Sequence, residues 1–119
     1  MSDSTAQTVR QLKIKTGVVK RLFKEEKTYR VEAEDQRKVL AKLKDEDADG
    51  ADIRNAERVL KDSEQMIPRT RKSLEDAVLA LQDLVDALAA EPSLSETPEY
   101  TAAKSQLEEV DAAWKINGA

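Results

Sequence analysis

The sequence contains no cysteine and no histidine, which removes disulfides, thiolate chemistry, the commonest metal ligand and the usual neutral-pH general base. Aromatic residues make up 3% of the chain, and it has only three glycines and three prolines, so turns are few. No apolar run approaches the roughly 18 residues of a membrane span. Residues 1–8 are polar, so no signal peptide is expected. We therefore expect a cytoplasmic protein that is not an enzyme.

Charge and helix-forming residues dominate what is present. Charged residues account for 37% of the 119 residues, and Ala, Glu, Lys, Leu and Arg are abundant, which is typical of long helices. The net charge of −4 hides a basic start, because residues 1–30 hold eight Lys/Arg and three Asp/Glu. This length predicts one domain, residues 1–119.

Large aliphatic residues recur every seven positions through the middle of the chain: Ile53, Leu60, Ile67, Leu74, Leu81 and Leu88. Taken as heptad position a, with small or apolar residues three places on at position d, they form the seam of a helix that lies along a partner helix. The spacing predicts a helix over 52–90, with Asp52 capping it after a break at Asp49-Gly50. Pro68 is expected to bend this helix, because proline lacks a backbone donor.

A second seam, beginning at Leu12, predicts a helix over 9–44, preceded by a flexible tail at 1–8. Phe23 and Val39 should widen this seam. Glu26 and Gln36 interrupt it, either as register-setting polar residues or as points of water exposure. A third helix is predicted over 98–116, with Thr97 as its cap and Pro98 in its first position. Together these helices predict an all-α fold, an elongated up-down-up three-helix bundle.

The acidic stretch from Asp45 to Gly50 resembles the start of a calcium-binding loop. Such a loop also needs a bidentate Glu at its twelfth position. That position is Ala56 here, and Glu57 comes one place late. We therefore expect a solvated acidic turn and no metal site.

The candidate interaction surface is basic. Lys13, Lys20 and Lys27 repeat every seven residues at an outward position, with Arg21 and Lys24 beside them. This face is either ordinary solvated surface or a binding surface for an acidic protein or nucleic acid. Nucleic acid is disfavoured because the net charge is negative and no binding motif occurs. A membrane is disfavoured because the apolar stripe is committed to a neighbouring helix.

Three apolar residues are expected to point outward from the heptad frame: Ile14, Val31 and Leu79. Isolated exposed aliphatic residues are normal on protein surfaces. The alternative is that these three apolar residues and the basic residues together form a contact surface for a partner.

Three stretches are similar to one family. The segment Gln11–Leu22, followed by Lys24-Glu25, closely resembles the first helix of the tubulin-binding cofactor A family. Met66-Ile67-Pro68 resembles that family's mid-helix proline, and Glu99-Tyr100 its third-helix entry. The similarity spans about residues 9–110, and its first motif is long and specific.

The resemblance implies a three-helix bundle that captures β-tubulin during folding and passes it toward the α/β dimer without nucleotide. It marks Lys13, Ile14, Lys20, Arg21 and Lys24 as candidate contacts, and other tubulin-folding cofactors as further partners. The chain is expected to be a monomer or weak homodimer in the cytoplasm, associated with the cytoskeleton. The alternative function is a structural coiled-coil or adaptor protein that self-associates through residues 30–65.

Overall fold

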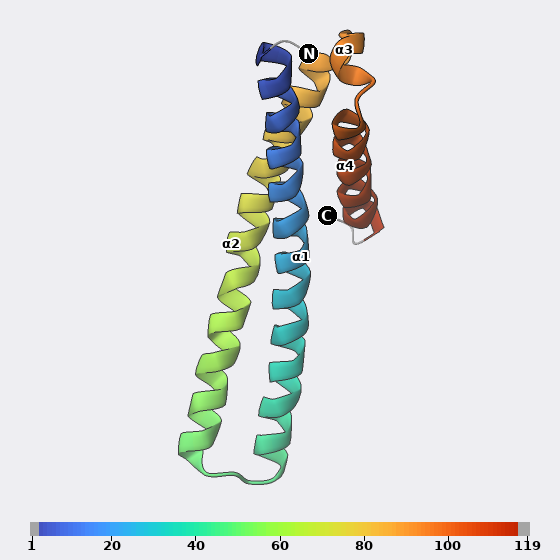
Figure 1. Ribbon diagram of the computed structural model, residues 1–119. Coiled ribbons are helices and arrows are strands. Elements are labelled where there is room, and N and C mark those ends of the chain that lie inside the picture. Colours follow the sequence, from blue (N-terminus) through green and yellow to red (C-terminus); the bar gives the residue numbers. More distant parts are fainter. Residues whose placement is uncertain (1–2, 117–119) are drawn as a thin grey trace. The chain divides into compact units, whose positions relative to one another are not determined.

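Two long helices account for most of the chain. The computed structural model describes residues 3–116, in which α1 spans Asp3–Asp45, α2 spans Gly50–Leu88, α3 spans Pro92–Ser95 and α4 spans Pro98–Ile116 (Figure 1). The described residues contain no strand, which confirms the all-α class. The predicted start of the first helix is wrong, because α1 begins at Asp3, six residues before Val9. Flexibility of residues 1–8 stays a prediction. Residues 1 and 2 lie outside the described part of the chain.

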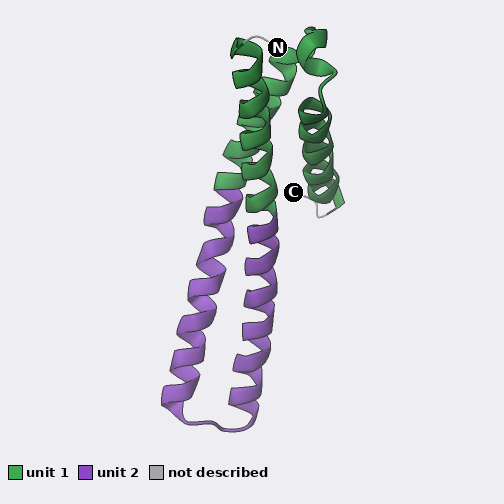
Figure 2. Cartoon of the chain, in the orientation of Figure 1, with its two compact units in different colours: residues 1–23, 73–119 green, residues 24–72 purple. Residues whose placement is uncertain are grey.

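The contacts group the chain into two compact units (Figure 2). Unit 1 combines residues 1–23 with 73–119, and unit 2 is residues 24–72. Helix α2 continues through Pro68, which is exposed. The bend at Pro68, the elongated up-down-up arrangement and the single domain stay predictions.

Unit 1 contains an apolar core built from three helical segments and the short α3. Fully buried aliphatic side chains come from α1, α2 and α4: Leu12, Val19, Leu74, Leu81 and Val110. The Tyr100 hydroxyl donates to the Val85 carbonyl at 3.3 Å, which fixes the start of α4 against α2. The buried apolar stripe of α4 is Tyr100, Ala103, Leu107 and Val110, with Trp114 part-buried at its end.

Unit 2 is an antiparallel hairpin of two helical segments (Figure 2). It buries the side chains of its seam less deeply than unit 1 does. Its buried side chains are small or polar: Glu26, Ala33, Ala56 and Thr70. Its large aliphatic seam residues are only part-buried: Leu40, Leu43, Ile53, Leu60 and Ile67. A two-helix layer leaves two sides of each seam open to water, which explains the difference.

The first turn differs from the prediction at both ends. Asp47 has φ 52°, in the left-handed region, and it ends α1 in a Schellman arrangement. The Ala48 amide donates to the Leu43 carbonyl at 3.0 Å, and the Asp47 amide donates to the Lys44 carbonyl at 3.3 Å. Asp49, not Asp52, caps α2, because its Oδ1 accepts from the Ala51 amide at 3.2 Å.

The second loop holds a helix that the sequence analysis missed. Helix α2 ends at Leu88, two residues earlier than predicted, and α3 occupies Pro92–Ser95 inside the predicted loop. Leu94 of α3 is buried in the core of unit 1. Thr97 caps α4 as predicted, since its Oγ1 accepts from the Tyr100 amide at 3.2 Å.

Candidate partner-binding surface

The predicted basic residues all lie on the outside of α1. In unit 1 the exposed cations are Lys13, Lys20 and Arg21, and in unit 2 they are Lys24 and Lys27. Within residues 3–116, Lys13, Lys20 and Lys24 form no ion pair. Their charges are therefore available to a partner, although a role in binding stays a prediction.

Lys13 also borders a surface groove that the sequence analysis did not anticipate. The groove has a volume of about 260 Å³ and lies between α1 and the start of α4. Its other lining residues are Thr16, Pro98, Glu99 and Ala102. Lys13, the first basic residue of the Gln11–Leu22 stretch, and Glu99, from the Glu99-Tyr100 stretch, both line this groove. These two stretches, distant in sequence, share one surface of unit 1.

The predicted apolar residues are exposed as the heptad frame requires. Ile14 is 51% exposed, Val31 59% and Leu79 63%. One related prediction is wrong: Val39 does not widen the buried seam, because its side chain is 47% exposed. Val59, at 41%, was not singled out. Both lie beside the seam, where burial depends on whether another element covers that side.

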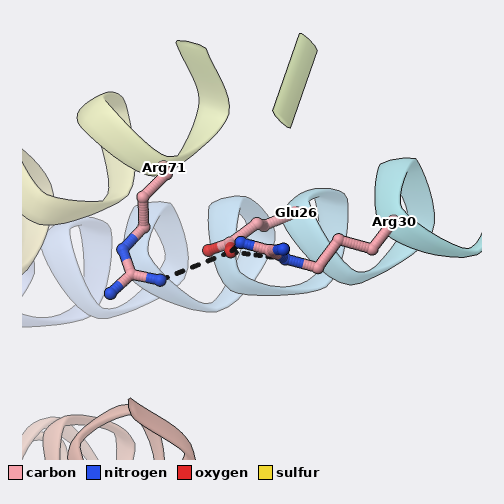
Figure 3. A network of polar contacts seen from close by, with 3 residues as sticks. All are labelled: Glu26, Arg30 and Arg71. Atoms are coloured by element: carbon pink, nitrogen blue, oxygen red, sulfur yellow. Dashed lines mark hydrogen bonds and ion pairs between the residues drawn. The ribbon is translucent and has the colours of Figure 1, made fainter. Parts of the chain in front are cut away.

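Glu26 is a polar interruption whose carboxylate contacts an arginine across the seam (Figure 3). Glu26 is 6% exposed. Its Oε2 accepts hydrogen bonds from Arg30 Nη2 at 2.7 Å and from Arg71 Nη1 at 3.5 Å. Arg30 lies one turn away on α1, whereas Arg71 comes from α2. A carboxylate inside a seam is costly unless it is paired. The burial of Glu26 excludes water exposure as the reason for its place in the seam. Its contact with Arg71 joins α1 to α2 at one position, and a register-setting role stays a prediction.

Two sides of the hairpin in unit 2 flank the seam. Arg37 of α1 and Glu64 of α2 both occupy heptad position e, and Arg37 Nη2 lies 3.2 Å from Glu64 Oε2. Hydrogen bonds from Arg37 to Glu64, and then to Glu34, raise the pKa of Arg37 above its ordinary value. This contact places the e positions of both segments on one side, here called the e side. The g positions lie on the opposite side, here called the g side.

The acidic turn is a helix-to-helix connection. Asp45, Glu46, Asp47 and Asp49 are exposed, and the Asp49 carboxylate is used in capping α2. Across residues 3–116, no group of three or more metal-ligating side chains is placed to hold an ion. In that same range, no helix is long and apolar enough to cross a membrane.

The fold is all-α, and its candidate functional groups lie on outer helix faces. Comparison with known proteins finds relatives with which this chain shares sequence and fold. A family model described as "Tubulin binding cofactor A" matches residues 7–107. "Tubulin-specific chaperone A" from Homo sapiens is 42% identical over 102 residues, covering 86% of this chain and 92% of that protein. "Tubulin-folding cofactor A" from Arabidopsis thaliana is 38% identical over 104 residues, covering 87% and 91%.

Two solved structures match as well. The structure titled "human tubulin chaperone cofactor a" has a TM-score of 0.73 at 40% identity and covers 87% of this chain and 98% of that one. The crystal structure of tubulin folding cofactor A from Arabidopsis thaliana has a TM-score of 0.74 at 36% identity, with coverages of 90% and 98%. The chain belongs to the tubulin-binding cofactor A family.

Proposed function

We propose that this protein is a tubulin-folding chaperone that captures and holds β-tubulin folding intermediates on the way to the α/β-tubulin dimer. It acts by surface binding in the cytoplasm, without nucleotide and without catalysis. Family membership supports the tubulin-folding role. The specificity for β-tubulin and the holding mechanism belong to this proposal, as does hand-over to other tubulin-folding cofactors.

The exposed cations of α1 carry the proposal. Lys13 and Lys20 of unit 1, and Lys24 of unit 2, project from the segment that resembles the family's first helix and form no ion pair among the described residues. Unpaired surface cations steer an acidic partner and set association rates more than final affinity. Binding through them should weaken as salt rises, because a Debye length of about 8 Å at physiological ionic strength shortens further.

The test is binding of purified protein to β-tubulin released from a folding reaction, with α-tubulin as the comparison. Lys13→Glu combined with Lys20→Glu is expected to lower the association rate about tenfold and to reduce its salt dependence. Lys24→Glu tests the part in unit 2 and should act less. Circular dichroism confirms that each variant keeps its helix content.

Lys38→Glu is the control, because Lys38 is exposed on α1 but lies after the stretch Gln11–Glu25 that resembles the family's first helix. Equal effects of the control and the Lys13/Lys20 variant would reduce the basic face to solvated surface. Failure of the unmodified protein to bind β-tubulin would remove the proposed function. A stable dimer in sedimentation that shields residues 30–65 would favour the structural coiled-coil alternative.

A further inference from the structure

The g side of unit 2 carries an exposed apolar centre. Val39 and Val59 both occupy g positions and are 47% and 41% exposed. The Gln36 side chain donates to the Ala56 carbonyl at 3.3 Å, which sets the two segments in register. At a rise of about 1.5 Å per residue, this register puts Val39 and Val59 within about 10 Å of each other along the hairpin. Part-buried Met66 continues the apolar row on α2.

Acidic residues border this centre, and no basic residue shares its heptad position. The seven g positions of unit 2 are three apolar and four acidic residues: Glu25, Glu32, Val39, Glu46, Asp52, Val59 and Met66. Glu46 lies 4.0 Å from Lys42, one turn away on the same helix. Glu32 and Asp52 are exposed and form no ion pair within the described chain. At its own heptad positions, the g side therefore carries apolar and acidic residues only.

The e side of the same hairpin is different. Its charged residues at position e include both signs: Arg30, Arg37, Lys44, Glu57, Glu64 and Arg71. Arg37 bonds across the hairpin to Glu64, and Arg71 bonds to buried Glu26. The charges of the e side are thus partly satisfied inside the hairpin, whereas the g side lacks a cation at the matching positions. A partner with basic residues would complement the charge of the g side.

We propose that the g side of unit 2 is a docking surface for an amphipathic helix whose apolar stripe is bordered by lysine or arginine. Such a helix would bury Val39 and Val59, as the third helix of a bundle buries the residues beside a seam. Its cations would form ion pairs with Glu32 and Asp52. A second copy of this chain fits poorly, because pairing two g sides brings acidic borders together. The proposal goes beyond β-tubulin binding, since it names a surface and a chemistry separate from the basic face of α1.

The probe is a synthetic helical peptide of about 18 residues, or five turns, with a leucine stripe bordered by lysines. The matched peptide carries glutamates in place of those lysines. With the full-length protein, titration calorimetry should show saturable binding of the lysine peptide, at least about tenfold tighter than the glutamate peptide, and weaker in high salt. Amide shifts should concentrate on the g positions of unit 2.

Val39→Ser with Val59→Ser should weaken lysine-peptide binding about tenfold, because the apolar area buried on docking is lost. Val31→Ser is the control, since Val31 is 59% exposed in the same unit but at an outward position. Glu32→Lys should narrow the preference between the two peptides. Both peptides binding alike, an unaffected double variant, or wild-type dimerisation abolished by the double variant would overturn the proposal. No step uses tubulin, so the result is independent of the proposed function.

Discussion

The two units use the same heptad pattern but bury it to different depths. In α2, the three a-position residues of unit 1 are Leu74, Leu81 and Leu88, and none is more than 7% exposed. The three of unit 2 are Ile53, Leu60 and Ile67, and all are part-buried. A heptad seam therefore predicts helix pairing, but the depth of burial depends on a third segment, which α4 supplies in unit 1.

The residues at heptad position e differ between the unit with a third helical segment and the unit without one. In unit 1 they are mostly apolar and join the core: Val9, Phe23, Val78 and Val85. In unit 2 they are charged, as Arg37 and Glu64 are. Apolar flanks bind a covering helix, whereas charged flanks stay in water and pair with each other. The change from apolar to charged residues at position e therefore indicates where the core covered by a third segment ends.

The largest expected effect tests the difference in burial. Leu81→Ala in unit 1 should lower the unfolding free energy by about 3–4 kcal/mol, because a fully buried leucine leaves a cavity. Leu60→Ala, at the same heptad position in unit 2, should cost about half as much, since water already reaches its side chain. Urea unfolding followed by circular dichroism gives both values.

Equal losses in these two variants would contradict the comparison. One cooperative transition in both would agree with the single domain expected from chain length, whereas a separate early transition of Leu60→Ala would show that unit 2 unfolds alone.

The next effect concerns the polar seam of unit 2. Glu26→Ala should cost about 2–3 kcal/mol, because it leaves Arg71, only 20% exposed in its side chain, without this carboxylate in the seam. Arg30→Ala should cost less than about 1 kcal/mol, since Arg30 is half-exposed. Replacing Glu26 and Arg71 together by leucine should recover most of the loss. A double variant as unstable as Glu26→Ala would argue against a role limited to register.

The seams were predictable from sequence, because period alone places side chains on one face of a helix. Leu12 and Leu81 are buried, and Lys13 and Leu79 point outward, as the heptad frame predicts. Flanking positions were not predictable in this way. Val39 was expected to be buried, but a g position is covered only where another element lies on that side.

Features that depend on tertiary contacts were also missed. Arg71, the partner of Glu26, lies 45 residues away, and only the register of the two helices brings them together. Helix α3 has four residues, too few to show a period, and its Leu94 is held by the core of unit 1. The outward face of the candidate site could thus be predicted, whereas its groove beside Pro98 could not.

A smaller effect is a gain in unit 1. Gly17 lies inside α1, exposed, with open space where a Cβ would stand. Gly17→Ala should therefore raise the unfolding free energy by about 1 kcal/mol through helix propensity, seen as a higher urea midpoint. Gly50→Ala is the control, because Gly50 is the first residue of α2 and a Cβ there would lie 3.1 Å from Arg54 Nη1. A gain at Gly50 as large as at Gly17 would be unexpected.

The smallest effect lies in the turn of unit 2, where Asp47 adopts a left-handed backbone at φ 52°. Asp47→Gly should stabilise the protein by about 0.5 kcal/mol, because glycine has no Cβ penalty in this conformation and still completes the Schellman motif. Asp47→Ala should destabilise it by a similar amount, since alanine lacks the short polar side chain that makes this region tolerable. Thermal melts at one buffer composition rank the three proteins. Alanine matching or exceeding glycine would mean that the turn relaxes out of the left-handed region, and that the end of α1 in unit 2 is set by something other than this residue.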